Sequence, residues 1–278
     1  MSAPARIARL VSVETTKVAG GRLVWMGLVA VAAATVLTGA LTEQVGPMTG
    51  WTIAARALGT GLWAAEIFVL VAGTTSVAGE TDRGTLKMIL PHAYRRSDWI
   101  FAKGLVLLAI ALALLLVAVG AALAVGAARA GLGDVTQTFE GGFGEPGRVE
   151  VLHASSAMAS RFAESATVAA ASLAATALLG LFVSCAFDAV IPALSTGFLL
   201  FMGLKSAGTL FGISPDALAA IYASYPGAML DLLDKIGRGF GYSWDATRLG
   251  KGLELSGLVA LASTAASLVV FGRRDLRS

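Results

Sequence analysis

Six stretches of the chain are apolar and almost free of charged residues, and polar segments separate them. A helix of about 20 apolar residues is long enough to cross a hydrocarbon core of about 30 Å, so each stretch is a candidate span. The expected spans cover residues 23–42, 57–79, 104–128, 165–187, 189–204 and 255–272. The 189–204 stretch is short for a span, and it could lengthen past Lys205 if that side chain reached toward the lipid headgroups.

The composition agrees with a membrane protein and excludes a soluble one. Hydrophobic residues make up 56% of the 278 residues and charged residues only 14%, and the mean hydropathy is +0.76. A soluble domain of this length would need many more charged side chains on its surface. We therefore expect a single all-α transmembrane domain over residues 1–278, a polytopic bundle of six helices in the lipid bilayer.

Basic residues are concentrated in three segments that alternate correctly to lie on one side of the membrane. The leader 1–22, the link 80–103 and the tail 273–278 together carry twelve of the 21 Lys and Arg residues. The other nine lie among eleven acidic residues on the opposite side. Lys and Arg favour the cytoplasmic side, so we expect a multi-pass protein of the cell (inner) membrane with both termini in the cytoplasm.

The leader has the pattern of a helix that lies along the inner leaflet. Ile7, Leu10 and Val11 recur at helical spacing, and Arg9 and Lys17 fall outside that apolar stripe. Such a helix would place its cations against anionic headgroups while its apolar face enters the bilayer.

Two segments on the expected outer side are more than connectors. Residues 129–164 begin rich in glycine, as a loop does, and then become rich in Ala and Ser, so the fourth helix is expected to begin early. The Ser-Pro-Asp sequence at 214–216 is typical of a helix start, and 229–236 is a short amphipathic segment. We expect two short helices between the last two spans, lying at the outer interface.

The link between the second and third spans has the pattern of a short rigid helix. Residues 84–90 can form two helical turns with their large apolar side chains on one side. Pro91 would end this helix. Glu80 and Asp82 precede it, where acidic residues are favourable near a helix N-terminus.

The link also resembles the cytoplasmic link of permease subunits of type-2 ABC exporters. In that family an acidic residue is followed by Gly-Thr-Leu, an apolar pair, a proline and a basic pair before the next span. The matching positions here are Glu80, 84–86, 89–90, Pro91 and 95–96. The leader resembles the family through Glu14 ahead of a basic residue, and the tail does so through residues 271–276.

This resemblance implies a permease that works as a dimer with two copies of a separate ABC ATPase. The ATPase would dock on the leader, at Arg9, Glu14 and Lys17, and on the link. The link residues implied in coupling are Glu80, Asp82, Arg83, Gly84, Thr85, Leu86, Lys87, Pro91, Arg95 and Arg96. Substrate would pass between the two permease copies, and the short outer helices would cover its exit. ATP would bind the partner, because this sequence has no G-x-x-x-x-G-K-[ST] phosphate loop.

Glu66 is the one acidic residue inside an expected span. A charge there costs about 3 kcal/mol on insertion scales, so the side chain should face the protein interior, a cavity or a partner. It is a candidate substrate or proton site, or a carboxyl group hydrogen-bonded between helices. An ion- or proton-coupled secondary transporter using Glu66 is therefore an alternative function. A scaffold that anchors an ATPase for maturation of an extracytoplasmic enzyme is another.

Residues for other chemistry are sparse. The two histidines, His92 and His153, are expected on opposite sides of the membrane and so cannot share a metal ion. Cys185 lies in an apolar stretch and is interpreted as a small buried residue. The net charge of +3 does not indicate nucleic-acid binding, because the basic residues are scattered among the spans. We therefore expect a transport subunit without cofactors, and not an enzyme.

Overall fold

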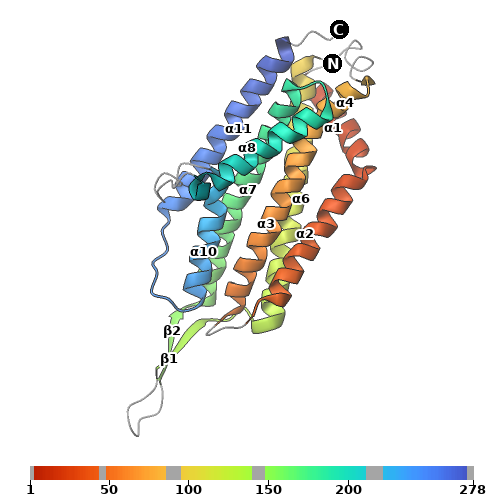
Figure 1. Cartoon of the computed structure of the whole chain (residues 1–278). Coiled ribbons are helices and arrows are strands. Elements are labelled where there is room, and N and C mark those ends of the chain that lie inside the picture. Colours follow the sequence, from red (N-terminus) through yellow and green to blue (C-terminus); the bar gives the residue numbers. More distant parts are fainter. Residues whose placement is uncertain (1–2, 44–47, 86–94, 140–147, 211–221, 274–278) are drawn as a thin grey trace.

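The computed structural model describes residues 3–43, 48–85, 95–139, 148–210 and 222–273, which form a bundle of long helices (Figure 1). Its helices are α1 (Ala3–Ala19), α2 (Arg22–Leu41), α3 (Gly50–Ser76), α4 (Ala78–Asp82), α6 (Arg96–Ala130), α7 (Ser155–Ala186), α8 (Val190–Leu210), the 3-10 turn η1 (Tyr222–Ser224), α10 (Tyr225–Gly237) and α11 (Thr247–Arg273). Strands β1 (Val135–Phe139) and β2 (Arg148–His153) form an antiparallel hairpin.

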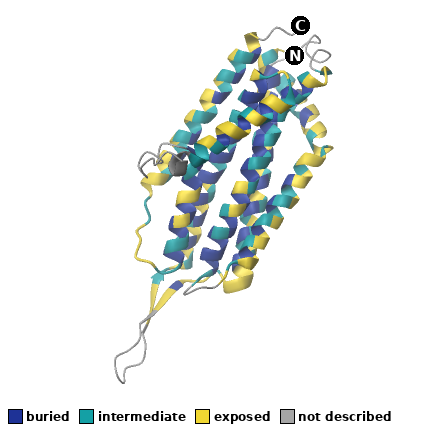
Figure 2. Cartoon of the chain, viewed as in Figure 1, coloured by how far each residue is buried: buried dark blue, intermediate teal, exposed yellow. Residues whose placement is uncertain are grey.

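Within these ranges, five helices are long and apolar enough to cross a membrane: α2, α3, α6, α7 and α11. The expected all-α polytopic membrane protein is confirmed. α3 and α7 are the most buried of the five, whereas much of α2 and α11 is exposed (Figure 2). Large apolar side chains such as Val29 and Leu261 lie on those exposed surfaces. Such surfaces suit contact with lipid or with another apolar helix.

The two ends of the bundle differ in character. α1, α4, the first turn of α6 and the last turn of α11 lie together at one end, which we call the basic end (Figure 1). The β1–β2 hairpin projects from the opposite end, which we call the hairpin end. α7 begins at Ser155, ten positions before the expected span, so the early start of this helix is confirmed. The hairpin itself was not predicted.

The fifth crossing of the bundle is made by two helices, α8 and α10, and not by one long helix. α8 begins at the basic end and runs obliquely over the bundle, and α10 continues from the middle of the bundle to the hairpin end (Figure 1). The expected helix at 189–204 is therefore present, but it is only the first part of a two-part crossing.

The expected position of the 229–236 helix at the outer interface is wrong. This segment belongs to α10, which packs against α3 and α7, and Met229, Leu233 and Ile236 are almost completely buried. Its apolar stripe fills a space between helices, which amphipathic spacing alone cannot distinguish from a lipid interface. The helix start at 214–216 lies outside the described residues.

Small residues allow α3 to approach its neighbours closely. A Cβ atom added to Gly73 of α3 would lie 2.8 Å from the carbonyl oxygen of Ala177 in α7. At the hairpin end, a Cβ on Gly50 would lie 2.6 Å from the carbonyl oxygen of Gly126 in α6. Small residues at such crossings let helix backbones pack tightly without a hydrophobic driving force. Cys185 is buried in α7, as expected.

Candidate functional site

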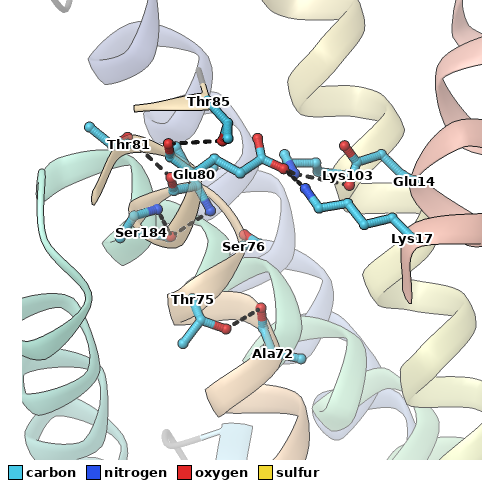
Figure 3. Close-up of polar contacts among 12 residues, drawn as sticks. Glu14, Lys17, Ala72, Thr75, Ser76, Glu80, Thr81, Thr85, Lys103 and Ser184 are labelled. Carbon is cyan, nitrogen blue, oxygen red and sulfur yellow. Dashed lines mark hydrogen bonds and ion pairs between the residues drawn. The ribbon is translucent and has the colours of Figure 1, made fainter. Parts of the chain in front are cut away.

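A buried ion cluster joins α1, α4 and α6 at the basic end (Figure 3). The ammonium group of Lys103 donates to Oε2 of Glu14 at 3.0 Å and to Oε1 of Glu80 at 2.9 Å. Lys17 of α1 pairs with the same oxygen of Glu80. We call Glu14, Lys17, Glu80 and Lys103 the four-residue cluster. It gathers charges from three separate helices around one lysine.

Each helix places its member of the cluster by ordinary packing. On α1, Glu14 follows Leu10 by one helical turn, and both side chains are buried. On α6, Lys103 is only 3% exposed, and its ammonium group lies 4.5 Å from the centre of the Trp99 ring. This cation–π contact adds to the two carboxylates in stabilising a buried positive charge.

Ser184 of α7 fixes the start of α4. Its hydroxyl oxygen accepts hydrogen bonds from the backbone N–H groups of Val77 at 2.9 Å and Ala78 at 2.8 Å. Unpaired N–H groups at a helix start need such an acceptor when they are buried. Glu80 therefore sits on a short helix that is anchored to α7 at one end and to α1 and α6 by its side chain. Its second carboxylate oxygen, Oε2, is buried and has no hydrogen-bond partner among the described residues.

Further contacts connect α1 and α11 to the first turn of α6. The guanidinium group of Arg6 donates to Asp98 at 2.8 Å. Trp99 stacks on Phe271 with ring centres 5.1 Å apart, and Arg96 donates to the carbonyl oxygens of Phe271 and Gly272. The first turn of α6 is thus the common attachment point for the leader and for the end of the last helix.

A cavity opens beside the four-residue cluster. Its volume is about 360 Å³, and it lies between the α1–α2 junction, the end of α3, α4 and α6. The exposed side chain of Arg83 lines it and makes no ion pair with a described residue. Lys17 is half-exposed there, and burial lowers its pKa, with a further lowering from the neighbouring charge of Lys103. The accessible rim of this cavity is therefore cationic, and its carboxylates are buried behind it.

The structure brings together some of the expected coupling residues and leaves others apart. Glu14, Lys17 and Glu80 meet in the cluster, whereas Arg9 is exposed on α1. Asp82 is exposed at the end of α4, and Gly84 follows with a φ of +70°, a left-handed conformation that suits glycine. The hydroxyl group of Thr85 donates to the Glu80 carbonyl oxygen.

The rest of the link is only partly described. Arg95 is exposed just before α6, and Arg96 is its first residue. Leu86, Lys87 and Pro91 lie outside the described residues, so the expected helix at 84–90 stays a prediction.

Lys103 and Asp98 are the members of this site that sequence reasoning missed. Lys103 was counted only as one of the basic residues of the link 80–103. Their positions could have indicated this role. Both are charged residues near the start of a long apolar helix, where charged side chains need partners.

Glu66 lies in the interior of the bundle, as its position in a span required. Its side chain is buried and pairs with Lys205 of α8. α8 does extend past Lys205, but this side chain pairs with a carboxylate on the neighbouring helix and does not need to reach the headgroups. Both residues line a second cavity of about 220 Å³, together with residues of η1 and α10. Within the described ranges, no group of three or more His, Cys, Asp or Glu residues is placed to hold a metal ion.

A comparison with models of protein families finds a match. The family model described as "ABC-2 family transporter protein" matches residues 63–276, which include α4, the cluster residues Glu80 and Lys103, and every later helix. The comparison with curated proteins gives no significant match.

Proposed function

Because this chain belongs to the ABC-2 family of transporter proteins, we propose that it is the transmembrane permease subunit of an ATP-driven exporter. The family and the apolar helices establish a multi-pass membrane protein that is a permease component of an ABC transporter. An ABC ATPase on another chain follows from the family in general. The proposal adds the direction of transport, the coupling to ATP and the place where the ATPase docks.

The observation that carries the proposal is the four-residue cluster. An ATPase that hydrolyses ATP in the cytoplasm must displace helices through elements that project from the bundle. α1 and α4 are the described elements of this kind at the basic end, and Lys103 holds both to α6. Force applied to the leader or to the link would therefore be shared between them through the ammonium group of Lys103.

The proposed orientation places the basic end in the cytoplasm. Arg9, Arg83 and Arg95 are exposed there. Arg and Lys favour the cytoplasmic side of a membrane. Both described ends of the chain lie at this end of the bundle (Figure 1). The hairpin would then project on the opposite side of the membrane.

A homodimer with two ATPase copies completes the proposal. α2 and α11 expose large apolar side chains along their length, so either face could pack against a second copy within the bilayer. Substrate would pass between the two copies.

The test is affinity purification of the tagged protein from native membranes in a mild detergent, with mass spectrometry of its partners. We expect a soluble ABC ATPase in near-stoichiometric amount. Arg95→Gln and Glu80→Gln should each reduce its recovery, whereas Arg248→Gln, an exposed residue in the first turn of α11, should not. Recovery of the protein alone in several detergents would contradict the proposal.

The Glu66–Lys205 pair supports a second candidate, a secondary transporter. A buried ion pair that lines a cavity is the arrangement expected of an ion- or proton-coupled site. The two candidates differ in energy source. Uptake into sealed inside-out vesicles should require ATP and the ATPase if the permease proposal holds. Uptake driven by a proton gradient alone, and lost in Glu66→Gln, would favour the second candidate.

A further inference from the structure

We propose that the cavity at the basic end binds an anionic phospholipid from the surrounding leaflet. The headgroup phosphate would lie against Lys17 and Arg83, and the start of one acyl chain would pack on the apolar wall of the cavity between α2, α3 and α6. This inference requires only that the bundle lies in a membrane, and it does not depend on ATP coupling.

The cavity lies at the level of the bilayer where lipid headgroups are located. Its lining includes Leu23, Gly79 and Lys103, which mark the points where three apolar spans begin or end. Phospholipid phosphates lie at the same boundary between hydrocarbon and water.

The charge accessible in the cavity is positive. Lys17 and Arg83 are exposed at its rim, whereas the side chains of Glu14 and Glu80 are only 10% and 6% exposed behind them. Lys17 uses one contact on Glu80 and can donate two more hydrogen bonds. Arg83 has no ion pair with a described residue, and its guanidinium group can bind a phosphate with two parallel hydrogen bonds. Lys17 and Arg83 therefore both have N–H groups that can donate hydrogen bonds to a phosphate.

The inner wall of the cavity is apolar. Leu23, Val24, Ala72 and Ile110 form this wall between α2, α3 and α6, and the pocket beyond them holds only about 10 Å³. A free phosphate would gain nothing from such a wall, whereas the first methylene groups of an acyl chain would pack against it. A cationic rim beside an apolar wall therefore favours a phospholipid over a free anion.

The test measures lipid binding to the purified full-length protein by native mass spectrometry, with phosphatidylglycerol and phosphatidylcholine titrated separately. Both lipids carry a phosphate and two acyl chains, but only phosphatidylglycerol has a net negative charge. We expect phosphatidylglycerol to bind more tightly. Arg83→Gln and Lys17→Gln should each weaken it about fivefold, the typical contribution of one cation near an anionic lipid.

Matched variants separate the contribution of the cations from that of the apolar wall. Arg273→Gln removes an exposed cation at the same end of the bundle but outside the cavity, so it should leave binding unchanged. Ala72→Phe adds a large side chain at the apolar wall without changing any charge, and it should weaken binding of phosphatidylglycerol. Arg83→Gln keeps the test decisive if Ala72→Phe fails to fold, because Arg83 is exposed.

Three results would overturn the proposal. The first is equal binding of the two lipids. The second is unchanged binding of phosphatidylglycerol in both Arg83→Gln and Lys17→Gln. The third is displacement of the lipid by millimolar inorganic phosphate or glycerol phosphate, which would indicate an anion site that takes no acyl chain.

Discussion

Lys103 and Glu80 form a buried ion pair between α6 and α4, with Nζ and Oε1 2.9 Å apart and side chains 3% and 6% exposed. Glu14 of α1 accepts from the same ammonium group. The side chain of Lys103 therefore contacts both α1 and α4. This arrangement makes Lys103 the residue whose replacement should have the largest effect at the basic end.

Lys103→Met should strongly destabilise the protein. It removes the cation and leaves Glu14 and Glu80 buried, and breaking a buried pair from one side costs about 3–5 kcal/mol. We expect a clearly lower thermal unfolding midpoint in detergent. The triple variant Lys103→Met, Glu14→Gln, Glu80→Gln should recover part of the lost stability, because it also removes the two buried carboxylates that lost Lys103 as a partner. A single variant as stable as the wild type would show that the pairing contributes little.

Ser184→Ala should loosen α4 without changing any charge. It leaves the backbone N–H groups of Val77 and Ala78 without their acceptor, and each unsatisfied buried donor costs about 1–3 kcal/mol. The expected result is faster hydrogen exchange over 77–82, together with reduced ATPase recovery in the purification experiment. Ser160→Ala is the control, since Ser160 is exposed near the start of α7. Unaltered exchange over 77–82 would argue against the anchoring role.

Gly73→Leu should disrupt the contact between α3 and α7. Even a Cβ atom there would lie 2.8 Å from a backbone oxygen, which cannot move aside as a flexible side chain can. Overpacking of this kind costs about 1–3 kcal/mol or more. We expect a low yield of monodisperse protein on size-exclusion chromatography. Gly203→Leu on α8 meets nothing within 4 Å of its added Cβ and should behave like the wild type.

The two partners of the Glu66–Lys205 pair should differ in their effect on stability. Lys205→Met leaves a carboxylate that is 3% exposed, whereas Glu66→Gln leaves an ammonium group on a side chain that is 25% exposed. An unpaired charge costs more where it is more deeply buried. Lys205→Met should therefore lower the thermal midpoint more than Glu66→Gln does. The reverse order would mean that Lys205, and not Glu66, is the less hydrated member of the pair.

Apolar runs and charge bias were sufficient to predict most of the architecture. Five expected spans correspond to α2, α3, α6, α7 and α11, because a helix in lipid must be apolar over its whole length. The split fifth crossing was not predictable in the same way. α10 is short and amphipathic, and only the partners on α3 and α7 determine that its apolar face is buried in the bundle.

The site could be predicted only in part. Glu14, Lys17 and Glu80 were named from the family resemblance, but their shared partner Lys103 was not. Sequence separation hides this contact, since Lys103 lies 89 positions from Glu14. The partner of Glu66 was hidden for the same reason, because Lys205 lies 139 positions away from it.

The unbroken length of α6 has a consequence for how the two sides of the membrane communicate. At 1.5 Å per residue, its 35 residues form a rod of about 52 Å, which exceeds the hydrocarbon thickness by about 20 Å. Arg96 ties its first turn to the end of α11, and Arg129 ties its last turn to the end of α2. A tilt of its first turn would therefore move its last turn as well, because no break in the helix separates them. Movement at one side of the membrane would in this way displace the base of the hairpin on the other side.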